Sequence, residues 1–460
     1  MNRLTTRRSA KAAAAPAFLL ALLLPARASA RQAQSDGATA MPGMTPAQAQ
    51  NLPMDANTPM NMQPQTFLQA IARHTTSGTD SQPDSTPAPM WMTGKGAWTL
   101  MFHANVFVLD EQQSSARGGD KFFSTNWSMP MAQRAAGPGV FTARAMLSLE
   151  PATVSGRRYP LLFQQGETAY GLPIVDGQHP HDFFMELAAM YDWKLGDKAL
   201  LSIYLAPVGD PALGPEAYPH RASALENPVA ALGHHQEDST HISDDVVTGG
   251  LAYGIARVEV SGFHGREPNE DRWEIQQGNI DSWSTRLTLQ PGKNWSGQYS
   301  YGHIVSIESL YPGENQERMT ASVMYNRPLK NGNWASTILW GRAKFLPDDS
   351  IYNSYLLESA VRFLTRNYVW TRIENVDRSN ELLLGENPLP PDFVEKPIGR
   401  VQAYTFGYDH DFDFIPRVAT ALGAQATMYS DGTPLRAIYG AHPVGGAIFV
   451  RFRPYSGNER

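Results

Sequence analysis

The sequence predicts an all-β protein: a transmembrane antiparallel β-barrel of about 16 strands, with about 14 as the alternative count, preceded by a disordered N-terminal arm. Three observations lead to this fold class. Apolar and polar residues alternate with a period of two in run after run from residue 98 to the C-terminus. Short connections alternate with long polar ones, as the turns and loops of transmembrane barrels do. After the first 30 residues, no apolar run approaches the ~18 residues of a membrane helix.

The N-terminus carries the features of an exported protein. Residues 1–30 combine a basic start, an apolar stretch over residues 12–24 and a small-residue cleavage site at residues 28–30, which together predict a signal peptide. Residues 31–90 are rich in Pro, Gln, Ser and Met, and only residues 66–74 have helical spacing. We therefore expect a flexible arm with one short helix. An alternative function for its methionines is Cu(I) binding, because thioethers are soft ligands.

The composition excludes several classes of protein. The chain has 460 residues, no cysteine and a formal net charge of −6, and the signal peptide holds five basic and no acidic residues. The exported chain is therefore more acidic still, which argues against a nucleic-acid partner. The lack of cysteine excludes a disulfide scaffold, a thiolate zinc site and a cysteine nucleophile.

The barrel domain is expected over residues 91–460. The run 183–193 is ambiguous by itself, since its apolar residues fit a helical period as well as a period of two. In the context of the other runs we interpret it as a strand, with Glu186 and Asp192 facing the lumen. Fifteen runs are clear, and a single-chain barrel needs an even number. We expect residues 157–165 to cross outward between two inward strands and so complete the set. The expected strands are residues 98–109, 140–150, 157–165, 183–193, 199–207, 247–253, 257–264, 282–290, 295–303, 318–326, 334–342, 353–363, 367–376, 400–409, 416–429 and 445–454.

The connections and the aromatic residues fit a membrane barrel. Long polar loops are expected at residues 110–139, 208–246, 265–281, 304–317, 343–352, 377–399 and 430–444. Seven of the ten tryptophans lie in or at the end of the strands, as in the aromatic girdles at membrane interfaces. These are Trp98, Trp193, Trp283, Trp295, Trp334, Trp340 and Trp370.

Three passages carry a resemblance to known proteins: "DGQHPHDFFMELA", "APVGDPALGPEAYPHRASALENPVAALGHHQEDSTHI" and "RIENVDRSNELLLGE". They resemble an uncharacterised group of bacterial outer-membrane, porin-like β-barrel proteins, over most of residues 65–455. The resemblance implies the barrel and the outer membrane, and it assigns no catalytic or binding residue. The methionine-bearing arm ahead of a barrel is more loosely similar to outer-membrane copper-resistance proteins.

Two sets of polar residues are candidate functional sites. Histidines are concentrated in two of the long loops. Imidazole and carboxylate ligands suit Zn²⁺, Cu²⁺ or Ni²⁺, so these histidines could bind a metal ion. The alternative is that their side chains pack a lid over the lumen. The candidate metal ligands are His179, His181, His234, His235 and His241. Charged residues of both signs on the polar strand faces either set the selectivity of a pore or brace its wall. The candidate lumen-lining residues are Arg144, Glu186, Arg286, Arg318, Glu358 and Arg372.

These features favour a non-enzymatic outer-membrane barrel that passes or gates a small hydrophilic solute. A Cu or Zn ion could be linked to that function. The alternatives are a metal-capturing surface protein without a conducting pore, and an outer-membrane lipid hydrolase in which Ser239 and His241 of "DSTHIS" take part. The expected partners are outer-membrane lipid, a small solute or metal ion, and the barrel-assembly machinery during biogenesis. No cofactor is certain from the sequence.

Overall fold

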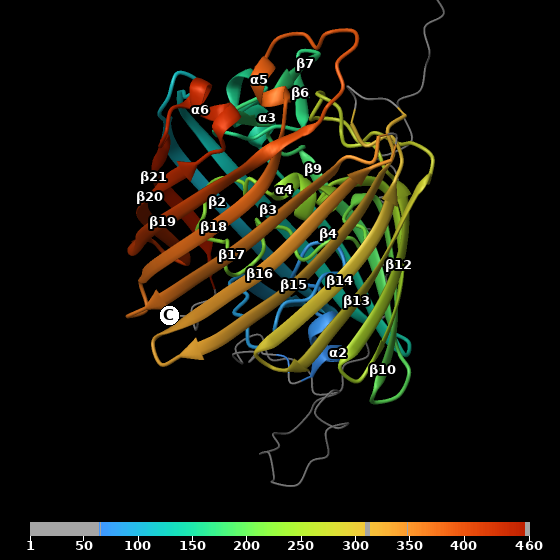
Figure 1. The fold of residues 1–460 in the computed structure, drawn as a ribbon. Coiled ribbons are helices and arrows are strands. Elements are labelled where there is room, and N and C mark those ends of the chain that lie inside the picture. Colours follow the sequence, from blue (N-terminus) through green and yellow to red (C-terminus); the bar gives the residue numbers. More distant parts are fainter. Residues whose placement is uncertain (1–63, 65, 309–312, 347, 456–460) are drawn as a thin grey trace, which may run out of the picture. The chain divides into compact units, whose positions relative to one another are not determined.

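The computed structural model describes residues 64, 66–308, 313–346 and 348–455, which all belong to one compact unit that begins at residue 56. Its strands form a closed antiparallel ring of 16 strands, in which each strand pairs with its neighbours in the sequence (Figure 1). The last strand closes the ring on the first, with Val106 opposite Phe452. The predicted fold class is therefore confirmed. The predicted signal peptide and residues 31–63 of the arm lie outside the described residues.

The strands of the ring are β2 (Trp98–Gln113), β3 (Asp120–Ala136), β4 (Gly139–Leu147), β9 (Phe184–Lys194), β10 (Ala199–Gly209), β11 (Ser243–Tyr253), β12 (Ala256–His264), β13 (Ser282–Gly292), β14 (Trp295–Ile304), β15 (Gln316–Leu329), β16 (Gly332–Phe345), β17 (Ile351–Phe363), β18 (Asn367–Ser379), β19 (Pro397–Ile415), β20 (Val418–Ser430) and β21 (Val444–Pro454). A short additional strand, β1 (Trp91–Lys95), pairs with the first part of β2, beside the stretch that pairs with β21. It covers a strand edge that β21 leaves open, and uncovered edges invite unwanted pairing.

Small elements occupy the connections. Among the described residues no helix has both the length and the apolar character needed to cross a membrane. The loop after β4 is the most structured (Figure 1). The small elements are α2 (Phe67–Ile71), α3 (Glu150–Thr153), η3 (Ser155–Arg157), β5 (Tyr159–Pro160), β6 (Glu167–Ala169), β7 (Leu172–Ile174), β8 (Gly177–Gln178), α4 (His234–Glu237), η4 (Ser239–His241), α5 (Glu381–Leu384) and α6 (Thr433–Tyr439).

The count of strands was predicted correctly, but one strand was assigned to the wrong segment. Residues 157–165 are not a strand of the ring: only Tyr159 and Pro160 pair, with β8 of the same loop. The missing strand is β3, in a region that we predicted to be a long loop. Its apolar side chains face the interior, its outward positions are largely polar, and it contains Pro130, a residue that argues against a strand. The usual barrel pattern, with apolar residues outward and polar residues inward, is therefore reversed in β3 and interrupted by the proline.

Strand directions follow from the same correction. Gly139 of β4 lies opposite Trp193 of β9, and Trp193 precedes the short turn to β10, so β4 begins at the short-turn end and runs outward. The prediction that it runs inward was wrong. The prediction for β9 is confirmed: it is a strand, with Glu186 and Asp192 buried on its inner side.

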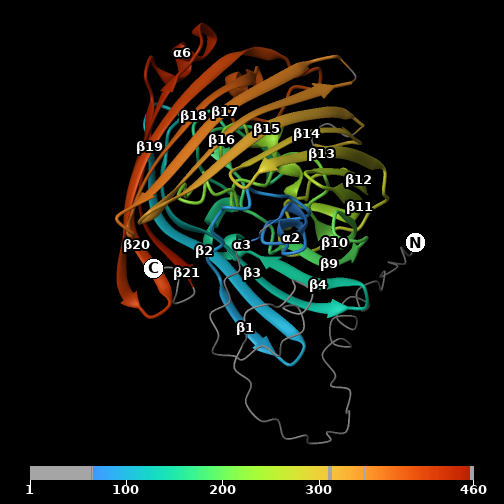
Figure 2. The ribbon, with the colours of Figure 1, turned by 90° about the horizontal axis from the view of Figure 1, so that it is seen from below.

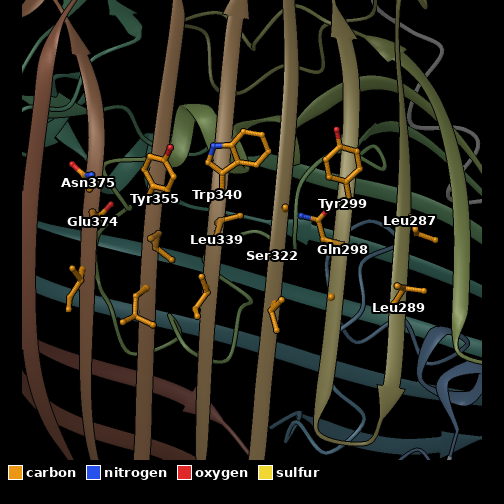
Figure 3. A pocket seen from close by; sticks show the side chains of 17 residues that line it. Leu287, Leu289, Gln298, Tyr299, Ser322, Leu339, Trp340, Tyr355, Glu374 and Asn375 are labelled. Carbon is orange, nitrogen blue, oxygen red and sulfur yellow. The ribbon is translucent and has the colours of Figure 1, made fainter.

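The outer surface is apolar, as a lipid-facing wall requires. Large exposed hydrophobic side chains recur on alternate positions of neighbouring strands. Over β13 to β18 they surround a shallow depression of about 620 Å³, where Tyr299 of β14, Trp340 of β16 and Tyr355 of β17 project from the wall (Figure 3). Of the seven tryptophans predicted to form girdles, Trp370 is an exception: it is 1 % exposed and packs against Phe449 in the interior.

Candidate functional site

Residues 66–90, here called the luminal segment, lie along the inside of the ring, where Figure 2 shows α2 within the circle of strands. The predicted helix is present as α2, and the Thr66 side chain caps it by accepting a hydrogen bond from the Gln69 backbone. Its apolar face, Phe67 and Ile71, packs on Leu200 of β10. The sequence places the whole segment in the flexible arm, because beyond the helical spacing of residues 66–74 it has no periodic signal of a fixed position.

Arginines of the inner wall hold the luminal segment by its backbone. Arg144 donates hydrogen bonds to the carbonyl oxygens of His74 at 2.9 Å and of Gly78 at 2.6 Å, and also to that of Thr76. The same guanidinium donates to both carboxylate oxygens of Glu186, at 3.0 and 2.6 Å. One buried ion pair of the wall therefore also fixes three peptide groups of the segment.

Further contacts continue the attachment along the wall. Arg257 donates to the carbonyl oxygen of Thr79 at 2.6 Å, and Arg286 pairs with Asp80. His74 Nε2 lies 2.5 Å from the carboxylate of Asp192. All of these contacts are polar, and water can replace hydrogen-bond partners of this kind.

The loop between β10 and β11, residues 210–242, also enters the ring and is here called the luminal loop. Its central anchor is Arg221, which donates to Glu358 of β17 at 2.8 Å and to Asp238 of the same loop at 3.1 Å. The hydroxyl groups of Ser223 and of Thr337 on β16 lie 2.7 Å apart. The loop and the luminal segment also touch each other: Ser77 donates to Asp210 at 2.9 Å.

The six predicted lumen-lining residues all lie on the inner wall, and each is at most 3 % exposed. Two buried ion pairs form among them, Arg144 with Glu186 and Arg372 with Glu358. Arg286 contacts the luminal segment, while Arg318 donates to Ser239 of the luminal loop at 2.8 Å. These charged side chains therefore point toward the luminal segment and the luminal loop, which fill the ring.

The five predicted histidines divide into two groups. His179 and His235 come together with Glu167 of β6, so that one ligand atom of each lies within 4.8 Å of the others. His179 Nε2 is 3.1 Å from Glu167, and Glu267 approaches His235 at 3.9 Å. Sequence reasoning missed both glutamates, because they stand in loop stretches without any pattern.

His181, His234 and His241 form the second group, around Tyr218. The ring centroid of His241 lies 5.5 Å from that of His181 and 5.2 Å from that of His234. Each has a local partner: Glu150 for His181 at 3.0 Å, Asp238 for His234 at 2.6 Å, and the Asp238 carbonyl oxygen for His241 at 2.8 Å. These bonds support the packing role for this group.

Burial governs the protonation of the loop residues. It lowers the pKa of His241 to about 3 and that of His235 well below its ordinary value, so both imidazoles are neutral at pH 7. Burial also lowers the pKa of His181, but the Glu150 carboxylate outweighs it and the pKa rises above 6.5. Burial would raise the pKa of Glu167, whereas His179 and Arg272 hold it below its usual range. A neutral imidazole such as that of His235 is the form in which histidine binds a metal ion.

The proposed hydrolytic pair is not assembled. Within the described ranges, Ser239 makes no hydrogen bond with His241: it donates to Glu267 at 3.3 Å, while His241 Nδ1 faces the backbone of Asp238. A serine nucleophile needs a base within hydrogen-bonding reach.

The closed ring of 16 strands, the apolar outer surface and the long loops at one end define a porin-like β-barrel of the bacterial outer membrane. Among solved structures, the chain is similar to an anion-selective porin from Comamonas acidovorans (9 % identity, TM-score 0.49, 77 % of this chain and 99 % of that chain). It is also similar to OmpF of Salmonella typhi in complex with daunomycin (8 %, 0.48, 79 % and 100 %) and to the outer membrane channel DcaP of Acinetobacter baumannii (9 %, 0.44, 78 % and 98 %). No protein-family model and no curated protein matches the sequence. Because the TM-scores are below 0.5, the class rests on the strand pairing and the outer surface.

Proposed function

We propose that this barrel passes a small hydrophilic solute across the outer membrane, and that the luminal loop and the luminal segment gate the passage. The observation that carries the proposal is the polar attachment of both elements. Arg144, Arg257 and Glu358 bind them through hydrogen bonds and ion pairs. Apolar residues of the luminal loop, such as Leu213 and Leu232, add contacts in buried clusters that include wall residues. Polar contacts can exchange for water, so these bonds are the part of the attachment that water can replace when the barrel opens.

The experiment is a disulfide lock on the luminal loop. Ser223→Cys with Thr337→Cys replaces two hydroxyl groups that lie 2.7 Å apart, so the sulfurs stand within bonding reach. The chain has no other cysteine, so only one bond can form. A matched control is Thr405→Cys with Thr427→Cys, where two wall hydroxyls lie 2.8 Å apart on β19 and β20 and leave the loop free.

Solute flux and ion conductance are measured in lipid bilayers before and after reduction. We expect the oxidised loop lock to lower both strongly, reduction to restore them, and the wall control to be insensitive to reductant. Equal flux in the oxidised and reduced loop lock would show that the luminal loop is not the gate. If the wild-type barrel showed neither ion conductance nor solute flux, the proposal that it passes a solute would be wrong.

A second candidate function is metal capture at the loops, which the convergence of Glu167, His179 and His235 favours. One carboxylate and two imidazoles suit Zn²⁺ or Cu²⁺. We expect refolded wild-type protein to retain Zn²⁺ or Cu²⁺ after dialysis, and His235→Ala to retain markedly less. His410→Ala, on β19, is the control. Equal metal content in the wild type and in His235→Ala would end this proposal.

A further inference from the structure

A second group of potential metal ligands lies on the inner wall, away from the loop histidines. Met101 and His103 of β2 face Met131 and Met129 of β3, each directly opposite. Met146 follows on the inner face of β4. The group belongs to one buried cluster that contains six methionines: Met90, Met101, Met129, Met131, Met146 and Met185.

The luminal loop adds an imidazole to this wall. His220 Nε2 lies 2.7 Å from the sulfur of Met146. The ring of Trp127 packs beside both histidines, with its centroid 4.0 Å from that of His220 and 4.7 Å from that of His103. The centroids of His103 and His220 are 6.0 Å apart. Two imidazoles that share one ion stand roughly 6 Å apart when they oppose each other across it, since each nitrogen lies about 2 Å from the ion.

The imidazole nitrogens of this group are buried without partners. Neither ring nitrogen of His103, nor Nδ1 of His220, has a hydrogen-bond partner within the part of the chain that the structure describes. His103 is 5 % exposed and His220 2 %. Buried polar atoms are normally satisfied, so three unpartnered nitrogens in one place call for a ligand. A ligand that accepts lone pairs, as a metal ion does, satisfies them.

The chemistry of the donors selects the kind of ion. Thioethers and imidazoles are soft to intermediate ligands, and thioether sulfur suits Cu(I) rather than Zn²⁺ or Mg²⁺. The donors named above are sulfur and nitrogen atoms, and no carboxylate is among them, whereas a hard divalent cation would require oxygen ligands. The nearby cations Arg144 and Arg453 are neutralised by ion pairs with Glu186 and Glu226. A single positive charge without anionic ligands therefore fits this site.

We propose that His103, Met146 and His220 form a binding site for a soft monovalent cation of the Cu(I) and Ag(I) type, with Met129 beside them as a further thioether. This site is separate from the loop set of Glu167, His179 and His235, and it goes beyond the proposed passage of solute. Because His220 belongs to the luminal loop and the other ligands to the wall, a bound ion joins the loop to the wall.

The test uses the full chain, refolded in detergent, and Ag(I) as its nitrate in chloride-free buffer. We expect the wild type to bind one Ag(I) ion at this site, with a higher affinity than at any other site on the chain. Met146→Leu, which keeps the side-chain volume, should weaken that binding at least tenfold, and His220→Gln should do the same. Met428→Leu is the matched control, since Met428 is 62 % exposed on the outer face of β20.

Further measurements separate this site from other sources of silver binding. Heat-dependent migration on detergent gels verifies that each variant is a closed barrel. His235→Ala should keep its Ag(I) affinity, so failure of the loop metal proposal leaves this one intact. X-ray absorption of the Cu(I)-loaded chain should show both sulfur and nitrogen ligands. Equal Ag(I) affinity in the wild type, Met146→Leu and His220→Gln would overturn the assignment, as would an equal loss in Met428→Leu.

Discussion

Glu358 is the wall residue whose replacement should open the gate. It is fully buried on β17 and accepts hydrogen bonds from Arg221 of the luminal loop and from Arg372 of β18, both at 2.8 Å. Glu358→Gln keeps the shape of the side chain but removes its charge. Arg372 stays in the wall whether the loop is in or out, so the bonds to Arg221 and to Ser223 of the luminal loop differ between the closed and open states.

The size of the effect is set by the bond to Arg221, because the neutral hydroxyl of Ser223 can also donate to the amide oxygen of a glutamine. A hydrogen bond to a charged group contributes about 1.5–3 kcal/mol, and a neutral one about 0.5–1.5 kcal/mol. The closed state should therefore lose about 1–2 kcal/mol relative to the open state, which corresponds to roughly a 5- to 30-fold rise in the ratio of open to closed barrels.

Single-channel recording in planar bilayers measures this ratio directly. We expect Glu358→Gln to raise the open fraction by that factor, and the oxidised Ser223→Cys, Thr337→Cys lock to abolish the rise. Asp413→Asn is the control, because its pair with Arg366 is exposed and remote from the loop. An unchanged open fraction in Glu358→Gln, in barrels that still resist heat, would refute the role of this ion pair in gating.

Two further changes test other parts of the interior. Burial raises the pKa of Asp84 in the luminal segment from 3.8 to about 6, so the docked segment favours the protonated form of Asp84. The attachment of the segment should therefore weaken as the pH rises from about 4 through 6. Conductance should rise over that window in the wild type but not in Asp84→Asn. Arg451→Met leaves the carboxylates of Glu226, Asp409 and Asp411 without their shared cation, so it should destabilise the barrel by about 3–5 kcal/mol, measured as a lower temperature of gel-shift unfolding. Arg366→Met, at an exposed pair, should cost no more than about 1 kcal/mol; an equal loss in both variants would contradict the argument from burial.

The wall could be predicted from the sequence because lipid on one side and polar contents on the other impose a period of two. Strands such as β13 and β14 carry that contrast over their whole length. β3 lacked it, because Trp127, Met129 and Met131 face a locally apolar interior while its outward positions are largely polar. Parity gave the correct number of strands and could not indicate which segment was missing.

The contents of the barrel could not be predicted in the same way. Arg144 and Arg257 hold the luminal segment by its carbonyl oxygens, which every residue possesses. Its side chains therefore give no sign of these two attachments. The histidines of the two long loops were identified as a group, yet their division between Glu167 and Tyr218 depends on the path of the loop backbone. His220 stood among them in the sequence and contacts Met146 only because the luminal loop turns into the ring.

The seam of the ring has a consequence for the order of assembly. Val106 and Phe452 pair across 346 positions of sequence (452 minus 106), and the entropy lost in closing a loop grows with its length. Glu226, from the middle of the chain, accepts hydrogen bonds from both Arg451 and Arg453 of the final strand. Until the luminal loop is inside, Arg453 would enter a nascent barrel without its carboxylate partner, and Arg451 would have only Asp409 and Asp411 of β19. The loop therefore favours the docking of the last strand. Shortening it should delay closure during folding more than it shortens the lifetime of the finished ring.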